Sequence, residues 1–353
     1  MSEEALRWPA VLAHLLDGED LDEELAERVM GVLMRGEAES EHVAGFLIAL
    51  RAKGEASEEI AGFVRSMLAE AVTLDLPSDL GARLVDIVGT GGDGAGTFNI
   101  STVASVVVAA AGQPVAKHGN RAASSRCGSA DLLAAWGIDL ELPAEAVARC
   151  LEDLGITFLY ARAFHPAMRH VAAVRLQLGV RTVFNLLGPL SNPAAAPFQA
   201  VGVADSRLAP VMADALARLG RRHALVFRGE DGLDELTTTA PSTLWEVRDG
   251  RVTESRFDPR ELDLAPAAPA DLLGGDAARN VEIADAVLGG EHGPAADIVA
   301  LNAAAGLYAA DAVEDLAEGL ARAREVLASG EALALKDQWV ARTQELAREG
   351  GGG

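Results

Sequence analysis

The stretch that decides the fold runs from Val85 to Asp131 and reads VDIVGTGGDGAGTFNISTVASVVVAAAGQPVAKHGNRAASSRCGSAD. A short apolar run, Leu84–Val88, opens it and predicts a buried strand. The strand must end at the loop Gly89–Gly94, because GTGGDG holds too many glycines for a helix or a strand. NIST, at residues 99–102, then begins an alanine- and valine-rich segment that predicts a buried helix. A strand, a glycine loop and a helix start in succession are typical of an anion site, where backbone N–H groups and the helix dipole face the ligand.

The glycine spacing excludes the two commonest phosphate-binding motifs. No Lys-Ser or Lys-Thr pair follows Gly96, as a Walker loop requires, and GTGGDG lacks the spacing of the dinucleotide fingerprint. Taken alone, such a loop could equally be a tight connection that binds nothing. A second loop, KHGNRAASS at residues 117–125, follows another predicted strand at Pro114–Ala116 and combines cations, an amide and hydroxyls. Two donor-rich loops after successive strands predict one extended polyanionic ligand.

The composition excludes several classes of protein. The chain has 353 residues, enough for two domains, and its net charge of −23 argues against binding nucleic acid or an anionic membrane. In so acidic a chain, a polyanionic substrate needs a local basic pocket or a divalent cation. The two cysteines, Cys127 and Cys150, form no disulfide framework, which indicates a reducing cytoplasm. The N-terminus is not of signal type, and no apolar run approaches the roughly 18 residues of a membrane span.

The order of segments predicts a helical start followed by an α/β unit. Residues 1 to about 75 show apolar residues at helical spacing, and 74–81 is predicted to be a linker. From Arg83 onward, apolar runs alternate with helical segments, and two further strands are predicted at Ala200–Ala204 and His223–Phe227. Ligands of such sheets lie beyond the carboxyl ends of the strands, where both donor-rich loops and the pair Asp234-Glu235 are expected. Residues 164–181 and the tail from about 310 to 348 are predicted to be helical.

The motifs GTGGD, NIST and KHGNRAASS, in this order and spacing, resemble the anthranilate phosphoribosyltransferase family. The resemblance continues through FHPAM, VRLQLGVRTVFNLLGPLSNP and GLDELTTT and covers nearly the whole chain. It implies an α/β fold of the nucleoside phosphorylase/phosphoribosyltransferase type, with a small all-helical domain and a larger domain with a mainly parallel sheet. The implied small domain is residues 1–76, joined by inserted helices at about 164–186. Residues 77–163 and 187–353 would form the large domain.

The resemblance implies a reaction of tryptophan biosynthesis. The 5-phosphoribosyl group passes from phosphoribosyl pyrophosphate to the amine of anthranilate, and pyrophosphate leaves. Because the transition state has oxocarbenium character, catalysis needs leaving-group stabilisation and positioning, and we expect no catalytic acid, base or nucleophile. Mg²⁺ suits this task, since it takes oxygen ligands and bridges phosphates. The family also implies a cytoplasmic homodimer, paired through the helical domain, whose partners are small molecules and neither nucleic acid nor membrane.

The matching motifs imply the site residues. Anthranilate is expected at Gly89, Asn120 and Arg175, whose fork suits a carboxylate. The metal is expected at Ser101, Asp234 and Glu235. The residues expected to bind phosphoribosyl pyrophosphate are Gly89, Gly92, Asp93, Thr97, Asn99, Ile100, Ser101, Thr102, Lys117, His118, Gly119, Asn120, Arg121, Ala122, Ala123, Ser124, Ser125 and Ser129.

Plainer interpretations stay open for several of these residues. Asp234-Glu235 could be a solvated loop pair, and Arg175 a surface arginine of a helix. His118 and His165 could line an acceptor channel, but a single histidine is more often structural. Cys127 stands where the family often has serine, and a thiol is a poorer hydrogen-bond donor than a hydroxyl.

Three other functions compete with this one. A pyrimidine nucleoside phosphorylase shares the implied fold, but KHGNRAASS and the Asp234-Glu235 pair point away from it. A catalytically silent relative that binds nucleic acid should show a basic face and broken motifs, and this chain has neither. The sequence also leaves open a phosphoribosyltransferase that acts on another aromatic acid.

Overall fold

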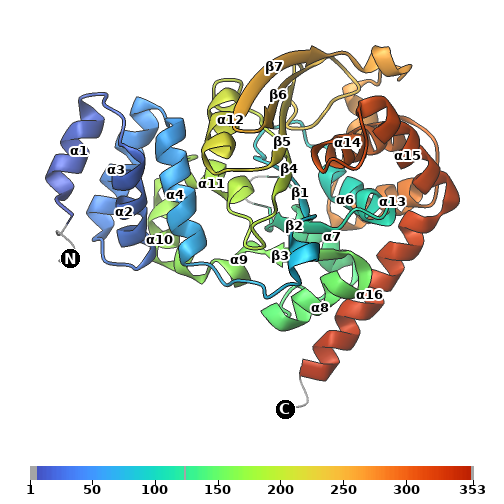
Figure 1. Cartoon of the computed structure of the whole chain (residues 1–353), viewed down its shortest axis with the longest axis horizontal. Helices are drawn as coiled ribbons and strands as arrows, with labels where there is room; N and C mark the ends of the chain where they lie inside the picture. Colours follow the sequence, from blue (N-terminus) through green and yellow to red (C-terminus); the bar gives the residue numbers. More distant parts are fainter. Residues whose placement is uncertain (1–5, 123–124, 351–353) are drawn as a thin grey trace.

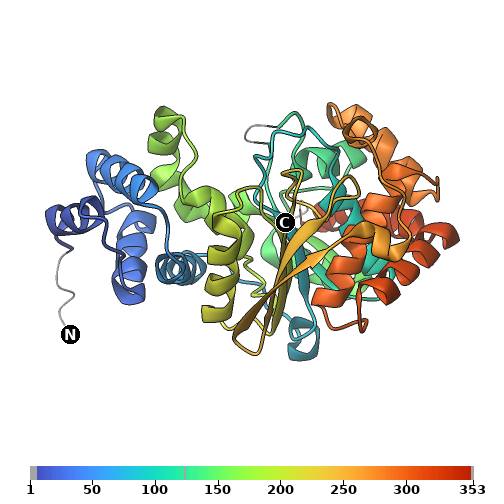
Figure 2. The same cartoon turned by 90° about the horizontal axis from the view of Figure 1, so that it is seen from above.

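The computed structural model describes residues 6–122 and 125–350. Its N-terminal part is a helical bundle, which lies at one end of the elongated molecule (Figures 1 and 2). Asp22 caps the second helix, since its side chain accepts a hydrogen bond from Leu25 N–H. The rings of Phe46 and Phe63 meet edge to face at 5.8 Å in the core of the bundle. The bundle consists of α1 (Trp8–Leu16), α2 (Glu23–Met34), α3 (Ser40–Lys53) and α4 (Ser57–Ala69), with α10 (Arg169–Leu178) packed on α2 and α3.

The rest of the described chain is built on one seven-stranded sheet with the order β3-β2-β1-β4-β5-β6-β7. The strands from β3 to β5 in this order are parallel, and β6 and β7 add an antiparallel hairpin at one edge. The strands are β1 (Val85–Gly89), β2 (Val115–Gly119), β3 (Ile156–Tyr160), β4 (Phe198–Gly202), β5 (His223–Gly229), β6 (Ser242–Arg248) and β7 (Arg251–Phe257).

Both faces of the parallel part of the sheet are buried under helices. Alternate side chains of a strand point to opposite faces, so Ile87 joins one hydrophobic core and Val88 the other. On the Ile87 face lie α6 and α14, and on the Val88 face lie α11 and α12, which continue into the core of the bundle. The remaining helices are α5 (Ser78–Gly81), α6 (Ile100–Ala110), α7 (Ser129–Trp136), α8 (Ala144–Leu154), α9 (Ala161–Phe164), α11 (Phe184–Leu190), α12 (Leu208–Arg218), α13 (Ala277–Leu288), α14 (Pro294–Ala309), α15 (Leu316–Ser329) and α16 (Glu331–Gly350), with 3₁₀ turns at Pro166–Met168, Pro259–Leu262 and Pro269–Leu272.

The predicted fold class is confirmed: a small helical bundle accompanies a larger α/β part with a mostly parallel sheet. The four predicted strands are all present, with ends that differ by up to three residues. The linker at 74–81 contains one helical turn, α5, and the helical tail begins at Leu316 rather than near residue 310. No helix within residues 6–122 and 125–350 is long and apolar enough to cross a membrane.

Candidate functional site

The loop that contains the acidic pair Asp234-Glu235 follows β5 and packs on the ends of β1 and β4. Gly89 and Gly202 are paired in register, and a Cβ atom on either would collide with Asp234. The added atom would lie 2.4 Å from Asp234 Oδ2 at Gly89 and 1.8 Å from the Asp234 carbonyl oxygen at Gly202. Glycine at both positions therefore lets Asp234 rest directly on the strand ends. The backbone of the first glycine loop fixes the carboxylate there, because Gly91 N–H donates to Asp234 Oδ2 at 2.6 Å.

The three residues expected to hold the metal come together. Glu235 Oε1 accepts a hydrogen bond from the backbone N–H of Ser101 at 3.2 Å, at the start of α6. Lys117 Nζ lies 3.4 Å from Ser101 Oγ and donates to the carbonyl oxygen of Ile87 at 2.5 Å. Lys117 is thus buried beneath the strand ends, although we expected a cation that reaches out to a phosphate.

The electrostatics of the acidic pair suit a cation. Burial, followed by repulsion from Asp93, raises the pKa of Asp234, and burial and the charge of Asp234 raise the pKa of Glu235 well above its usual value. Burial lowers the pKa of Lys117, against the attraction of Asp86 and Glu235. Two crowded carboxylates with one buried lysine favour a divalent ion that takes oxygen ligands, as Mg²⁺ does. Since the described residues hold no group of three or more His, Cys, Asp or Glu side chains suited to a metal, such an ion would need Ser101, water or phosphate oxygens as well.

The start of α6 places the predicted donor contacts beside this acidic pair. Asn99 is the N-cap residue, and its carbonyl oxygen accepts from the N–H groups of Thr102 and Val103. The Asn99 side chain does not cap the helix. Thr97 lies just before it and forms an isolated β-bridge with Leu273. The dipole of this buried helix favours an anion at its N-terminus, although the N–H groups of residues 100–103 already have acceptors in this structure.

The second donor-rich loop leaves β2 next to the first. Asn120 is exposed, and its Oδ1 accepts from Arg121 N–H at 2.8 Å. Asp131 of α7 closes the loop, because it pairs with Arg121 at 2.9 Å and accepts from Ala122 N–H at 2.9 Å. The hydroxyl of Ser129 donates to the Asn120 carbonyl oxygen at 3.2 Å.

Of the other predicted donor contacts of this loop, the structure describes Ser125. Ser125 Oγ donates to the carbonyl oxygen of Cys127 at 3.3 Å. Ala123 and Ser124 lie outside the described residues.

The predicted acceptor contact Arg175 lies on α10 with its guanidinium 5.0 Å from the centre of the Phe184 ring. It is half-buried, and within the described part of the chain no carboxylate forms an ion pair with it. Burial lowers its pKa, although an arginine stays charged. A guanidinium with an aromatic support and no acidic partner is suited to a carboxylate ligand.

The two histidines beside this region are neutral and held by backbone carbonyls. His118 Nδ1–H donates to Gly188 O and His165 Nε2–H to Ser191 O, each at 2.9 Å, with ring centres 5.1 Å apart. Burial and the neighbouring His165 lower the pKa of His118 to about 3. The His118 ring therefore contacts α11 through Gly188 and is no acid near pH 7.

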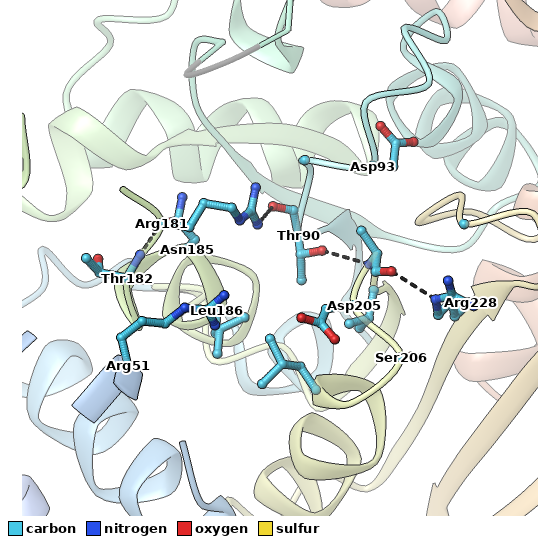
Figure 3. Close-up of a pocket in the computed structure, with 15 residues that line it drawn as sticks. Arg51, Thr90, Asp93, Arg181, Thr182, Asn185, Leu186, Asp205, Ser206 and Arg228 are labelled. Carbon is cyan, nitrogen blue, oxygen red and sulfur yellow. Dashed lines mark hydrogen bonds between the residues drawn. The ribbon is translucent and has the colours of Figure 1, made fainter. Parts of the chain in front are cut away.

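A cavity of about 420 Å³ lies behind the first glycine loop, between the helical bundle and the sheet (Figure 3). Three arginines line it, of which Arg51 comes from α3, and Arg228 donates to the carbonyl oxygen of Ala204. Arg181 donates to the Thr90 carbonyl oxygen at 3.2 Å and packs against Gly92, where a Cβ atom would lie 1.7 Å from it (Figure 3). Of the predicted donor residues, Gly92 and Asp93 line this cavity.

Our sequence analysis missed three residues that shape the site. Arg181 holds the first loop, and buried Asp86 accepts from His118 N–H at 3.0 Å. Asn280 is 1 % exposed and donates to Asn99 Oδ1 at 2.8 Å. The available signal was a polar residue inside an apolar segment: Asp86 in a predicted strand and Asn280 in a helix that follows Gly274-Gly275.

The fold and the site together define a glycosyl transferase built from a helical bundle and an α/β domain. Residues 81–333 match the model described as "Glycosyl transferase family, a/b domain", and residues 9–71 match "Glycosyl transferase family, helical bundle domain". Individual relatives narrow this class to one family and confirm the predicted resemblance. The chain belongs to the anthranilate phosphoribosyltransferase family.

Three members of this family illustrate the similarity. The anthranilate phosphoribosyltransferase of Arthrobacter sp. (strain FB24) is 51% identical, over 96% of both chains. The crystal structure of the enzyme from Thermus thermophilus has a TM-score of 0.89 and 50% identity, and the match covers 95% of this chain and 99% of that one. The enzyme from Saccharomyces cerevisiae in complex with PRPP and Mg has a TM-score of 0.87 at 28% identity, over 96% and 98% of the two chains.

Proposed function

We propose that this chain transfers the 5-phosphoribosyl group from phosphoribosyl pyrophosphate to the amine of anthranilate, in tryptophan biosynthesis. The observation that carries the proposal is the acidic pair Asp234-Glu235, which lies against the first glycine loop and the start of α6. This arrangement places carboxylates for a metal next to a helix N-terminus, whose dipole favours phosphates. The relative from Saccharomyces cerevisiae has been solved in complex with PRPP and Mg.

The donor is assigned to the two glycine-containing loops and the start of α6. Asp234, Glu235 and Ser101 would hold Mg²⁺, which when bound stabilises the negative charge that develops on pyrophosphate. The dipole at the start of α6 and the amides of Asn99 and Asn120 bind and orient the phosphates. Buried Lys117 balances the carboxylates from below.

The acceptor is assigned to the side of the site that faces α10. Arg175 pairs with the anthranilate carboxylate, and Asn120 and Gly89 form the floor on which the ring lies next to the donor. Neutral His118 and His165 shape this side without moving a proton. Because no residue forms a covalent bond in this reaction, rate acceleration comes from leaving-group stabilisation and from holding the amine in line with the anomeric carbon.

The proposed domain division takes the helical bundle as one unit and the sheet with its helices as the other. Residues 1–76 and about 164–186 form the small domain, and 77–163 and 187–353 form the large one, with the second core shared at their boundary. We further assign the protein to the cytoplasm as a homodimer that pairs through the helical domain. Exposed Leu16 and Ile48 on α1 and α3 support such a pairing, and the free thiols Cys127 and Cys150 support a reducing compartment.

The direct test is product analysis with purified protein, phosphoribosyl pyrophosphate, Mg²⁺ and one acceptor at a time. Mass spectrometry should detect N-(5-phosphoribosyl)anthranilate with anthranilate, and no product with aniline, which lacks the carboxylate. Release of thymine from thymidine and phosphate, with no anthranilate product, would establish a nucleoside phosphorylase instead. Light scattering checks the assembly, and a monomer mass at micromolar concentration rejects the homodimer.

A further inference from the structure

The segment before α13 covers the start of α6, where the proposed function places the donor. Gly274 N–H donates to the Gly96 carbonyl oxygen at 2.9 Å, and Phe98 N–H donates to Leu272 O at 3.2 Å. With the bridge between Thr97 and Leu273, these bonds make a short ladder next to the N-terminus of α6. Helix α13 also packs on α6 and α7 (Figure 1). A segment far along the chain therefore helps to build the donor site.

Asn280 connects this segment to Asn99 through a chain of amide hydrogen bonds. Gly275 N–H donates to Asn280 Oδ1 at 2.7 Å, and Asn280 Nδ2 donates to Asn99 Oδ1 at 2.8 Å. Asn99 Nδ2 then donates to the Cys127 carbonyl oxygen at 3.2 Å. A backbone N–H can only donate and a backbone carbonyl can only accept, so both ends of the chain have a fixed direction. The orientation of both side-chain amides is therefore determined.

The chain has a consequence for the face that Asn99 shows to a ligand. Asn99 Oδ1 accepts hydrogen bonds from Asn280 Nδ2 and from the thiol of Cys127, whose Sγ lies 3.4 Å away. Among the described residues, Cys127 O takes one of the two hydrogens on Nδ2, and the other is left for a ligand. Asn99 is half-buried and lies at the start of α6, where the proposed function places the donor phosphates. A phosphate accepts hydrogen bonds, and the amide in the opposite orientation would repel it.

We propose that Asn280 is a positioning residue of the donor site, which holds the Asn99 amide with an N–H group toward the donor phosphates. This inference rests on the proposed function and deepens it. Asn280 touches no substrate. It acts through Asn99 and, by way of Cys127, ties the start of α6 to the second loop. Its 1 % exposure and its hydrogen bonds with Gly275 N–H and Asn99 Oδ1 distinguish it from a surface asparagine.

The test compares donor binding to the full-length wild type, Asn280→Ala and Asn280→Asp by isothermal titration with phosphoribosyl pyrophosphate and Mg²⁺. Asp has nearly the same volume as Asn, but it places an acceptor oxygen opposite Asn99 Oδ1. The repulsion between the two oxygens favours the flipped orientation of the Asn99 amide. A lost hydrogen bond to a charged phosphate weakens binding by about 10- to 150-fold, so we expect an increase of this size in the donor Kd. The KM for anthranilate should not change. The control is Asp276→Ala, which removes the cap of α13 at Arg279 N–H and leaves the amide chain intact.

A double-mutant cycle with Asn99→Ala separates positioning from general damage. If Asn280 acts through Asn99, Asn280→Ala should have no further effect on donor Kd once Asn99 is alanine. An equal loss in both backgrounds, or Asn280 variants that bind the donor like Asp276→Ala, overturns the inference. Asn280→Asp carries the test alone if Asn280→Ala does not fold by circular dichroism. Wild type that binds no donor overturns the proposed function itself, and with it this inference.

Discussion

Arg175→Ala is the substitution that separates acceptor binding from donor binding. Arg175 is half-buried, and its guanidinium lies over the Phe184 ring. Within the described residues, no carboxylate forms an ion pair with it. Its charge is therefore available to the anthranilate carboxylate. A charge-assisted bond of this kind contributes about 1.5–3 kcal/mol, which corresponds to about 10- to 150-fold in kcat/KM.

The assay follows the loss of anthranilate fluorescence at saturating phosphoribosyl pyrophosphate. Arg175→Ala should lower kcat/KM for anthranilate by the factor above and leave the KM for the donor unchanged. Arg175→Lys should recover part of the loss, because a point charge does not reproduce the two-pronged geometry. Arg169→Ala is the matched control: this arginine is exposed at the start of the same helix and donates to Pro166 O at 3.4 Å. Equal anthranilate kinetics in wild type and Arg175→Ala would remove Arg175 from the site.

Three further changes test the metal, the buried lysine and the buried aspartate. Asp234→Ala with Glu235→Ala should abolish most turnover and leave the circular dichroism spectrum unchanged; full activity of this variant in excess chelator would refute the metal site. Lys117→Ala should raise the donor KM far more than the acceptor KM, because it leaves Glu235 without its buried counter-charge; unchanged donor kinetics would contradict this. Burial raises the pKa of Asp86 from 3.8 to about 6, so its contribution to stability is complete below pH 3.8 and is lost as the pH rises through 6. Asp86→Asn removes this dependence, and urea unfolding should show wild type losing about 3 kcal/mol relative to the variant between pH 4 and 7; parallel pH profiles would contradict it.

The sequence predicted the parts of the fold whose signal is local. Strands β1, β2, β4 and β5 are apolar runs that end in glycine or polar loops, and such runs identify buried parallel strands. Strand β7 was missed because its exposed sequence, RVTESRF, has no apolar run, and it is held by pairing with β6. Helix α14 was missed because it is buried on nearly all sides, so its apolar residues show no helical period.

The candidate site was predictable where a motif lies in one segment and unpredictable where it depends on distant contacts. Asp234, Glu235 and Ser101 could be named from their motifs. The place of Asp234 depends on glycines at the ends of two strands, and Glu235 meets the N–H of Ser101 across 134 residues. The burial of Lys117 could not be predicted, since it depends on a carbonyl group of the neighbouring strand. Asn280 meets Asn99 across 181 residues, a distance over which no local pattern carries information.

A crystal structure with phosphoribosyl pyrophosphate, Mg²⁺ and anthranilate bound to this chain tests the central claim most directly. We expect the metal between the pyrophosphate and Asp234, Glu235 and Ser101, and the phosphates at the start of α6. The anthranilate carboxylate should lie within hydrogen-bond distance of the Arg175 guanidinium, about 3 Å. Anthranilate bound instead among Arg51, Arg181 and Arg228, or a donor bound away from Asp234-Glu235, would contradict the account.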